Sequence, residues 1–318
     1  MSNFKTLLAI ASAIVLFLYG LEGFSQEIQK VGGESLRRGL GRLTASRWRG
    51  VALGALATAI VQSSSAVTSL TVALVDAGTI SLQSSLGVLL GANIGTTSTA
   101  WLVSLKLTSI GPFFIVLGAL LSALPTRFRM LGKAAFYFGF IFFSLDVVSF
   151  TLKPLAQNPV FTELLSQSRT PVMGVLAGIL VTAIVQSSSI VTGLCILLVQ
   201  QNLMAATAAI PIVIGANIGT TVTALVASIK MQKAARRVAV ANLCFNTFGV
   251  VLFLPFLGWF SVAVLEFAGE PGMAVAWAQL IFNVTMTVAV LLMLRLFQRR
   301  LASLDIKDPS EGTVPVAV

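Results

Sequence analysis

The sequence predicts an all-α polytopic membrane protein built from two inverted repeats, each with a re-entrant helical hairpin and a broken helix, plus a C-terminal transmembrane helix. Three observations lead to this prediction: the composition, an internal repeat and the distribution of basic residues. Of 318 residues, 56% are hydrophobic and 10% are charged, and the mean hydropathy is +0.94. Soluble domains usually have about a quarter charged residues, so much of this chain must face lipid or other apolar helices.

The internal repeat has a period of 124 residues. Residues 54–65 read GALATAIVQSSS and residues 178–189 read GILVTAIVQSSS, with ten of twelve positions identical. GANIGTT at 91–97 returns at 215–221, at the same offset. Because two separate blocks keep one offset, the duplicated unit is a whole module rather than a short chance match.

The repeat places the elements in order. Repeat 1 is assigned to residues 1–125 and repeat 2 to residues 126–258, with a final transmembrane helix within 259–300 and a disordered tail at 301–318. The N-terminal apolar run has no small-residue cleavage site, so it is interpreted as a first membrane helix rather than a removed signal peptide. The predicted elements are a helix at 5–25, the hairpin 50–76, the broken helix 81–107 and a helix at 109–125, then a helix at 131–152, the hairpin 172–200, the broken helix 203–230 and a helix at 237–258.

The basic residues decide how the QSSS segments sit in the membrane. Each segment could be one full span, or a hairpin with two arms of about 12 residues that each reach about 18 Å, half the bilayer. If both are hairpins, all dense basic segments lie on the cytoplasmic side with the C-terminus, as the positive-inside rule requires. If both are full spans, the basic loop 126–133 lies outside. Hairpins give each module three crossings, so the second copy is inverted and a transporter is indicated.

The other compositional features exclude several classes. The net charge is +10, but the basic residues lie in short segments between apolar runs, which indicates a multi-pass protein of the cell inner (plasma) membrane and not a nucleic-acid-binding protein. There is no histidine, and the two cysteines, Cys195 and Cys244, lie in apolar runs. This pattern argues against a disulfide framework or a metal cluster, and no cofactor is expected.

The QSSS motif is a candidate anion site. One serine in a membrane helix usually bonds to a carbonyl four residues earlier or allows close packing. Three successive hydroxyls cannot face one neighbour, because successive residues point about 100° apart. If the hairpin arms end at QSSS, the second arm exposes backbone N–H groups at a helix N-terminus, where anions bind. The serine hydroxyls and the glutamine amide add hydrogen-bond donors.

The GANIGTT motif is a candidate cation site. Its glycines permit a break in the helix, and its Asn and Thr oxygens, with unwound carbonyls, are ligands suited to Na⁺. The alternative is a glycine-rich helix crossing of the small-xxx-small type, and the spacing of Gly91 and Gly95 fits it. Both interpretations stay open at this point.

Few ionisable residues lie within the apolar runs. Glu22 and Asp146 occupy matched positions in the two repeats, near the ends of their helices. An intramembrane acid suggests function, whereas a position near a helix end also suits an interfacial residue, and the sequence does not separate these. Lys106 and Lys230 are interpreted as interfacial anchors whose stems lie along apolar surface.

The paired motifs, together with Arg236 and Arg237 followed by ANLCFN at 241–246, resemble the type II sodium–phosphate cotransporter family. The resemblance covers about residues 5–297 and implies sodium-driven phosphate symport, hairpins with QSSS at their tips and broken helices at NIGT, and it allows a homodimer. Electrogenic animal members have an Asp before the Arg pair, and 222–235 has no acid, so the stoichiometry stays open.

The resemblance also implies ligand sets. It implies phosphate at Gln62, Ser63, Ser64, Ser65, Gln186, Ser187, Ser188, Ser189, Asn93 and Asn217. It implies sodium at Ser64, Ser65, Asn93, Thr96, Thr97, Ser188, Ser189, Asn217, Thr220 and Thr221.

The leading hypothesis is therefore Na⁺-coupled phosphate symport by alternating access, with phosphate, Na⁺ and the lipid bilayer as partners. Transport of another anion and export of phosphate remain open, because a symporter follows its gradients. An intramembrane enzyme is disfavoured, since there is no histidine, no metal-ligand cluster and no acid beside the motifs. A regulatory or scaffold membrane protein would not need two polar cradles.

Overall fold

The computed structural model describes residues 2–41, 47–105, 110–124, 127–152 and 170–303, and every regular element within them is a helix. Six segments are long and apolar enough to cross a membrane, judged by length and composition: Leu8–Lys30, Leu82–Ser104, Phe128–Leu152, Ala206–Ser228, Lys233–Ala268 and Pro271–Leu294. The helices are α1 (Ser2–Gly41), α2 (Arg47–Val61), α3 (Ser64–Asp76), α4 (Leu82–Ser104), α5 (Gly111–Ser122), α6 (Arg127–Leu152), α8 (Pro171–Val185), α9 (Ser188–Gln200), α10 (Ala206–Ser228), α11 (Lys233–Phe253), the 3₁₀ turn η3 (Leu254–Phe256), α12 (Leu257–Ala268) and α13 (Pro271–Ser303).

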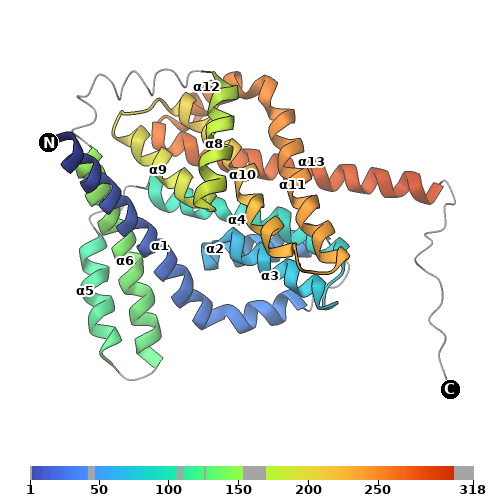
Figure 1. Ribbon diagram of the computed structural model, residues 1–318, viewed down its shortest axis with the longest axis horizontal. Coiled ribbons are helices and arrows are strands. Elements are labelled where there is room, and N and C mark those ends of the chain that lie inside the picture. The colour runs from blue at the N-terminus through green and yellow to red at the C-terminus, as the bar shows by residue number, and fades with distance from the viewer. Residues whose placement is uncertain (1, 42–46, 106–109, 125–126, 153–169, 304–318) are drawn as a thin grey trace.

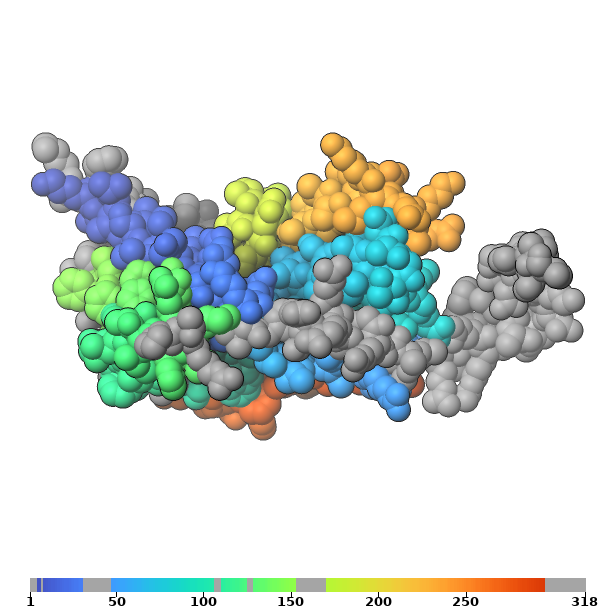
Figure 2. All heavy atoms as spheres, turned by 90° about the horizontal axis from the view of Figure 1, so that it is seen from below, coloured from blue at the N-terminus to red at the C-terminus, as the bar shows by residue number. Residues whose placement is uncertain are grey.

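The helices gather into two parts. α5 and α6 pack together at one end with α1 against α6, while α11 lies towards the other end (Figures 1 and 2). In the second part α2 packs on α4, α8 packs on α10, and α13 runs across the molecule in contact with α4, α9 and α10 (Figure 1). One buried apolar cluster includes Leu90, Ile196, Ile214 and Phe282, so both repeats and α13 share a core.

Each QSSS segment forms two helical arms with a break between them. α2 and α8 have 15 residues each, and α3 and α9 have 13. At 1.5 Å per residue these arms are about 20–22 Å long, shorter than the roughly 30 Å hydrocarbon core. The breaks fall at Gln62–Ser63 and Gln186–Ser187, within the two motifs.

The GANIGTT segments form continuous helices, which corrects the prediction of broken helices at 81–107 and 203–230. α4 and α10 each run for 23 residues through the motif. Their threonines satisfy carbonyls of the preceding turn: Thr96 Oγ1 donates to Ala92 O at 2.9 Å, and Thr220 makes the equivalent bond at 3.0 Å. Because the polar side chains bond to a helix that continues through the motif, they do not require unwinding, and no unwound carbonyl lies at the motif in α4 or α10.

The motif glycines are packing positions. α4 crosses α2 so closely that a Cβ on Gly91 would collide with the backbone carbonyl of Val51. In repeat 2, a Cβ on Gly215 would collide with the carbonyl of Val175. Small residues allow membrane helices this close an approach. The helix-crossing alternative therefore accounts for the glycines, and the Asn and Thr residues remain to be explained.

The C-terminal part also differs from the predicted boundaries. Residues 259–268, which follow the helix predicted at 237–258, belong to α12, which continues α11 through η3. Pro255 lies in that turn, where its missing N–H interrupts the helix without ending the apolar run. The last span begins at Pro271, inside the segment 259–300 that was predicted to contain it, and α13 ends at Ser303, within the tail predicted at 301–318. The rest of that tail lies outside the described residues.

Two helices of repeat 1 differ in length from the prediction. α1 continues from the apolar run to Gly41, so much of the basic segment after residue 25 is helical. α5 has 12 residues, or about 18 Å, and is shorter than the full span predicted at 109–125. It packs along α6 instead, where a Cβ on Gly118 would collide with the backbone of Phe136.

Candidate functional site

The breaks at the two QSSS motifs, called the hairpin tips below, share one backbone conformation. Gln62 and Gln186 lie in the left-handed region, with φ of 57° and 58°, which is uncommon for residues other than glycine. The next residue in each repeat is extended, and Ser63 Oγ accepts a hydrogen bond from Ala66 N at 3.2 Å. The repetition at equivalent positions shows that the QSSS sequence itself produces the break, after which α3 and α9 begin.

The two tips meet inside the molecule. Ser65 Oγ donates to the carbonyl oxygen of Gln186 at 3.4 Å. Thr99 Oγ1, on α4, lies 3.5 Å from Ser189 Oγ. Motifs that are 124 residues apart in the sequence are therefore neighbours in space.

A small polar cavity of about 10 Å³ lies beside this meeting point, between the first turn of α3, the middle of α4 and α10, and α11. None of its ten lining residues is charged. The predicted residues among them are Ser64, Ser65, Asn93, Asn217, Thr220 and Thr221, and the others are Thr68, Ala224, Asn242 and Asn246. The first tip and the second motif helix thus form one site.

Three polar lining residues were missed by sequence reasoning. Thr68 has a repeat partner in Thr192, which marks it as part of the duplicated module. Asn242 and Asn246 lie one turn apart on α11 and are only 7% and 5% exposed. Two amides at i and i+4 in an apolar helix are a signal for a buried polar face. Both asparagines belong to the ANLCFN segment at 241–246, so this signal was present in the sequence.

The other eight predicted residues lie outside the cavity wall. They are Gln62, Ser63, Thr96, Thr97, Gln186, Ser187, Ser188 and Ser189. Thr96 and Thr97 bond to carbonyls of their own helix. The second tip faces α4 through Ser189 and Thr99 rather than this cavity, and a ligand set with both tips around one phosphate stays a prediction.

The cavity is lined by groups that can donate hydrogen bonds and by groups that can accept them. Hydroxyl and amide N–H groups donate to an oxyanion, while hydroxyl and amide oxygens accept from donors or coordinate Na⁺. The N-terminus of α3 adds a partial positive charge that favours anions by about 0.3–1 kcal/mol. Among the described residues no group of three His, Cys, Asp or Glu could hold a metal ion. The cavity therefore presents neutral hydrogen-bonding groups to whatever it binds.

An asparagine network forms one wall of the cavity. Asn93 Nδ2 donates to Asn246 Oδ1 at 3.0 Å, and Asn246 Nδ2 donates to Asn242 O at 2.8 Å. From α13, Asn283 Nδ2 donates to Asn93 O at 2.9 Å. A hydrogen bond therefore connects the final helix, which lies outside both repeats, to the GANIGTT helix of repeat 1.

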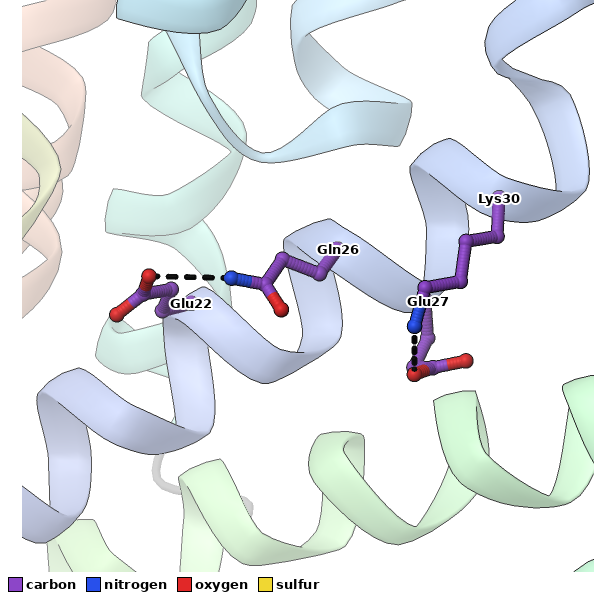
Figure 3. Close-up of polar contacts among 4 residues, drawn as sticks. All are labelled: Glu22, Gln26, Glu27 and Lys30. Carbon is purple, nitrogen blue, oxygen red and sulfur yellow. Dashed lines mark hydrogen bonds and ion pairs between the residues drawn. The ribbon is translucent and has the colours of Figure 1, made fainter.

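The acidic residues of α1 and α6 lie away from the cavity. Glu22 and Asp146 are exposed, and Glu22 Oε1 accepts from Gln26 Nε2 at 3.1 Å (Figure 3). Among the side chains of α1 that the structure describes, the buried carboxylate is Glu27, whose partner is Lys30 Nζ at 2.7 Å (Figure 3). Because an intact ion pair occupies Glu27 and the cavity lining has no acid, any cation in the cavity must be held by neutral oxygens.

The two tip glutamines differ in their contacts. Gln62 Nε2 donates to Ser98 Oγ at 2.8 Å, and Gln62 Oε1 accepts from Thr99 Oγ1 at 2.8 Å. Gln186 is exposed, and the hydroxyl of Thr223, the repeat partner of Thr99, is buried without a hydrogen-bond partner in the described part of the chain. The glutamine of the first tip is therefore hydrogen-bonded to α4, whereas the glutamine of the second tip makes no such bond to α10 among the described residues.

This difference predicts unequal effects of one substitution. Gln62→Ala should lower the thermal midpoint of the detergent-purified protein by several degrees, because it removes two hydrogen bonds to α4, worth about 1 kcal/mol each, and one to Ala59 O. Gln186→Ala should change the midpoint much less. The two sites share the same φ, so the backbone contribution cancels between the variants. Equal shifts would contradict the described asymmetry.

Comparison with known proteins gives one family. A model described as Na⁺/Pi-cotransporter matches residues 16–150 and 146–254. The chain is 29% identical to "Uncharacterized protein YqeW" of Bacillus subtilis over 296 residues, which cover 92% of this chain and 96% of that protein. No solved structure matches the chain.

Two further relatives have functional names. The chain is 27% identical to "Putative inorganic phosphate export protein YjbB" of Escherichia coli O157:H7, over 90% of this chain and 53% of that protein, so it matches only about half of that relative's length. It is 37% identical to human "Sodium-dependent phosphate transport protein 2B" over 102 residues, which cover 30% of this chain and 15% of that protein.

Proposed function

Because the chain belongs to the Na⁺/Pi-cotransporter family, we propose that this integral membrane protein carries inorganic phosphate across the membrane together with Na⁺, by alternating access. One observation carries the proposal: an uncharged polar cavity lies where the first hairpin tip meets the motif helix of the other repeat. A site shared between repeats can be exposed to either side when the repeats move against each other.

The proposed phosphate ligands are the donors at the start of α3 and on α10. Ser64 and Ser65 lie in the first turn of α3, where the backbone N–H groups and helix dipole also favour an anion. Thr220, Thr221 and Asn217 line the cavity from α10, where each donates to carbonyls of its own helix. These hydroxyl and amide groups would donate to phosphate oxygens by exchanging those intrahelical bonds.

The need for sodium follows from the absence of charge. An ion transferred from water into an uncharged interior is strongly disfavoured unless it is paired, and none of the cavity residues is Arg or Lys. A Na⁺ ion bound by hydroxyl and amide oxygens would supply the missing charge. Each ion would then raise the affinity for the other, and this coupling is reciprocal.

The test is uptake of ³²P-phosphate into proteoliposomes. An inward Na⁺ gradient should drive uptake, arsenate should compete, and unlabelled phosphate inside should accelerate entry of the label, as expected for a carrier rather than a channel. Uptake at the same rate in K⁺ or choline would contradict sodium coupling. Lack of competition by arsenate would instead favour another anion.

Export of phosphate is the second candidate, because a relative is named for it. A symporter reverses with its gradients, so the same cavity serves either direction. Proteoliposomes loaded with labelled phosphate and Na⁺ should release the label faster into Na⁺-free medium. If the protein moves phosphate outward with no Na⁺ on either side, the sodium-coupled proposal is wrong and a different exporter mechanism holds.

The proposal also includes a location. The protein would lie in the plasma membrane with its basic connections on the cytoplasmic side, as the positive-inside rule favours. The turn between α10 and α11 fits this assignment, since Lys230, Lys233, Arg236 and Arg237 there are all exposed. A homodimer, which the family resemblance allows, stays a prediction.

A further inference from the structure

A second small cavity, also of about 10 Å³, lies next to the first between α4, α11 and α13. Asn93 and Asn246 line both cavities, so their hydrogen-bonded side chains form the wall between the two. Half of the second lining is apolar, and it has no charged residue. The remaining residues that line it are Leu90, Phe245, Phe282, Asn283, Met286 and Thr287.

The polar side of this cavity comes from a stripe on α13. Gln279, Asn283 and Thr287 follow one another at intervals of four, so they share one face of the helix, and they are 0%, 2% and 2% exposed. Asn283 and Thr287 bond to α4 carbonyls, with Thr287 Oγ1 3.3 Å from Leu90 O. Burial of three polar side chains in one membrane helix costs free energy unless their polar groups are bonded or bind a ligand.

Backbone acceptors determine how the amides are oriented. Asn283 Nδ2 faces Asn93 O, and Asn246 Nδ2 faces Asn242 O; a main-chain carbonyl only accepts, so both nitrogens are assigned by chemistry. Asn246 Oδ1 must then face Asn93 Nδ2. All three amide nitrogens therefore donate to protein oxygens, whereas the Oδ1 atoms of Asn93 and Asn283 accept no hydrogen bond from any described residue.

We propose that the second cavity is a charge-free Na⁺ site, in which Asn93 Oδ1, Asn283 Oδ1 and Thr287 Oγ1 coordinate the ion. The Oδ1 atoms of Asn93 and Asn283 are unused acceptors, which suit a hard cation, and Asn246 Nδ2 already donates twice, to Asn242 O and Asn242 Oδ1. Asn93 and Asn283 each keep one further N–H. This inference rests on the proposed function, because the ion would be the coupling Na⁺. It also explains the coupling, since only the Asn93–Asn246 pair separates the ion from phosphate in the first cavity.

The test measures the Na⁺ dependence of phosphate uptake in Asn283→Leu and Thr287→Val. The Na⁺ concentration for half-maximal uptake should rise about tenfold or more in Asn283→Leu, equivalent to 1.4 kcal/mol of binding energy, and by a smaller factor in Thr287→Val. The phosphate KM at saturating Na⁺ should change less than about twofold. Thr285→Val, on the exposed side of the same helix, is the matched control and should behave as wild type.

A second measurement needs no transport. Na⁺ without phosphate should raise the thermal midpoint of the purified wild-type protein, and the midpoint should respond at about tenfold higher Na⁺ in Asn283→Leu. If Asn283→Leu does not fold, Asn283→Ser and Thr287→Val serve the same comparison. Unchanged Na⁺ dependence in folded variants would overturn the second site and leave the proposed function standing. A change in phosphate KM equal to the change for Na⁺ would also overturn it. A wild-type protein insensitive to Na⁺ would instead overturn the proposed function.

Discussion

Replacing Asn93 by leucine should abolish Na⁺-driven phosphate uptake, lowering the initial rate by at least about 100-fold, which corresponds to about 2.7 kcal/mol. Asn93 lines both cavities, so the change removes a polar group from each. It also leaves Asn246 Oδ1 without its donor, and an unpaired buried polar atom costs about 1–3 kcal/mol. Leucine is close to asparagine in size, so packing of α4 against α13 should change little.

The measurement is ³²P-phosphate uptake per mole of protein in proteoliposomes, with gel filtration to confirm that the variant is folded. Gln83→Leu is the matched control, because it is the same kind of exchange at an exposed position on the same helix. It should transport at the wild-type rate. If folded Asn93→Leu also transports near that rate, the cavity between the two repeats is not the transport site.

Replacing Gly91 by alanine should prevent the protein from reaching its folded state. The added Cβ would lie on the backbone carbonyl of Val51, which cannot move without separating α2 from α4. Overpacking by one methyl group typically costs about 1–3 kcal/mol where side chains can yield, and the cost should be larger against backbone. Separation of these helices would also displace the first hairpin tip, because α2 leads into it.

The measurement is the yield of monodisperse protein in gel filtration and its thermal midpoint. Gly258→Ala is the control, since the nearest atom to a Cβ there is Pro171 Cγ at 4.0 Å. That change should be neutral or slightly stabilising, because alanine favours helix over glycine by about 0.5–1 kcal/mol. Equal yields for the two variants would show that α2 and α4 do not cross as closely as described.

The parts that could be predicted from the sequence have local causes. The break at QSSS follows from the motif itself, since both copies adopt the same left-handed glutamine and the same extended serine. The apolar runs predicted membrane helices because hydropathy and length are properties of each segment alone. The family resemblance came from the motifs in the same way and agrees with the matched family model.

The errors arose where a residue had two possible partners. Gly91 could break α4 or let it approach α2, and only the position of α2 selects the second. Thr96 donates to Ala92 O, a carbonyl that an intact helix places within reach, and its expected role in binding Na⁺ stays a prediction. The two tips have equal sequences, yet only the first lines the cavity, because different helices surround each copy.

The sequence by itself determined the class of protein, the duplication and the polar residues available, because composition, period and residue type are present in the linear chain. Tertiary structure alone decided which of those residues share a cavity. Asn93 belongs to one hydrogen-bond network with Asn242 and Asn246 on α11 and Asn283 on α13, although these residues are far from it in the sequence. That choice depends on how helices pack, and packing is set by the close approach of backbones at a few small residues rather than by any one segment.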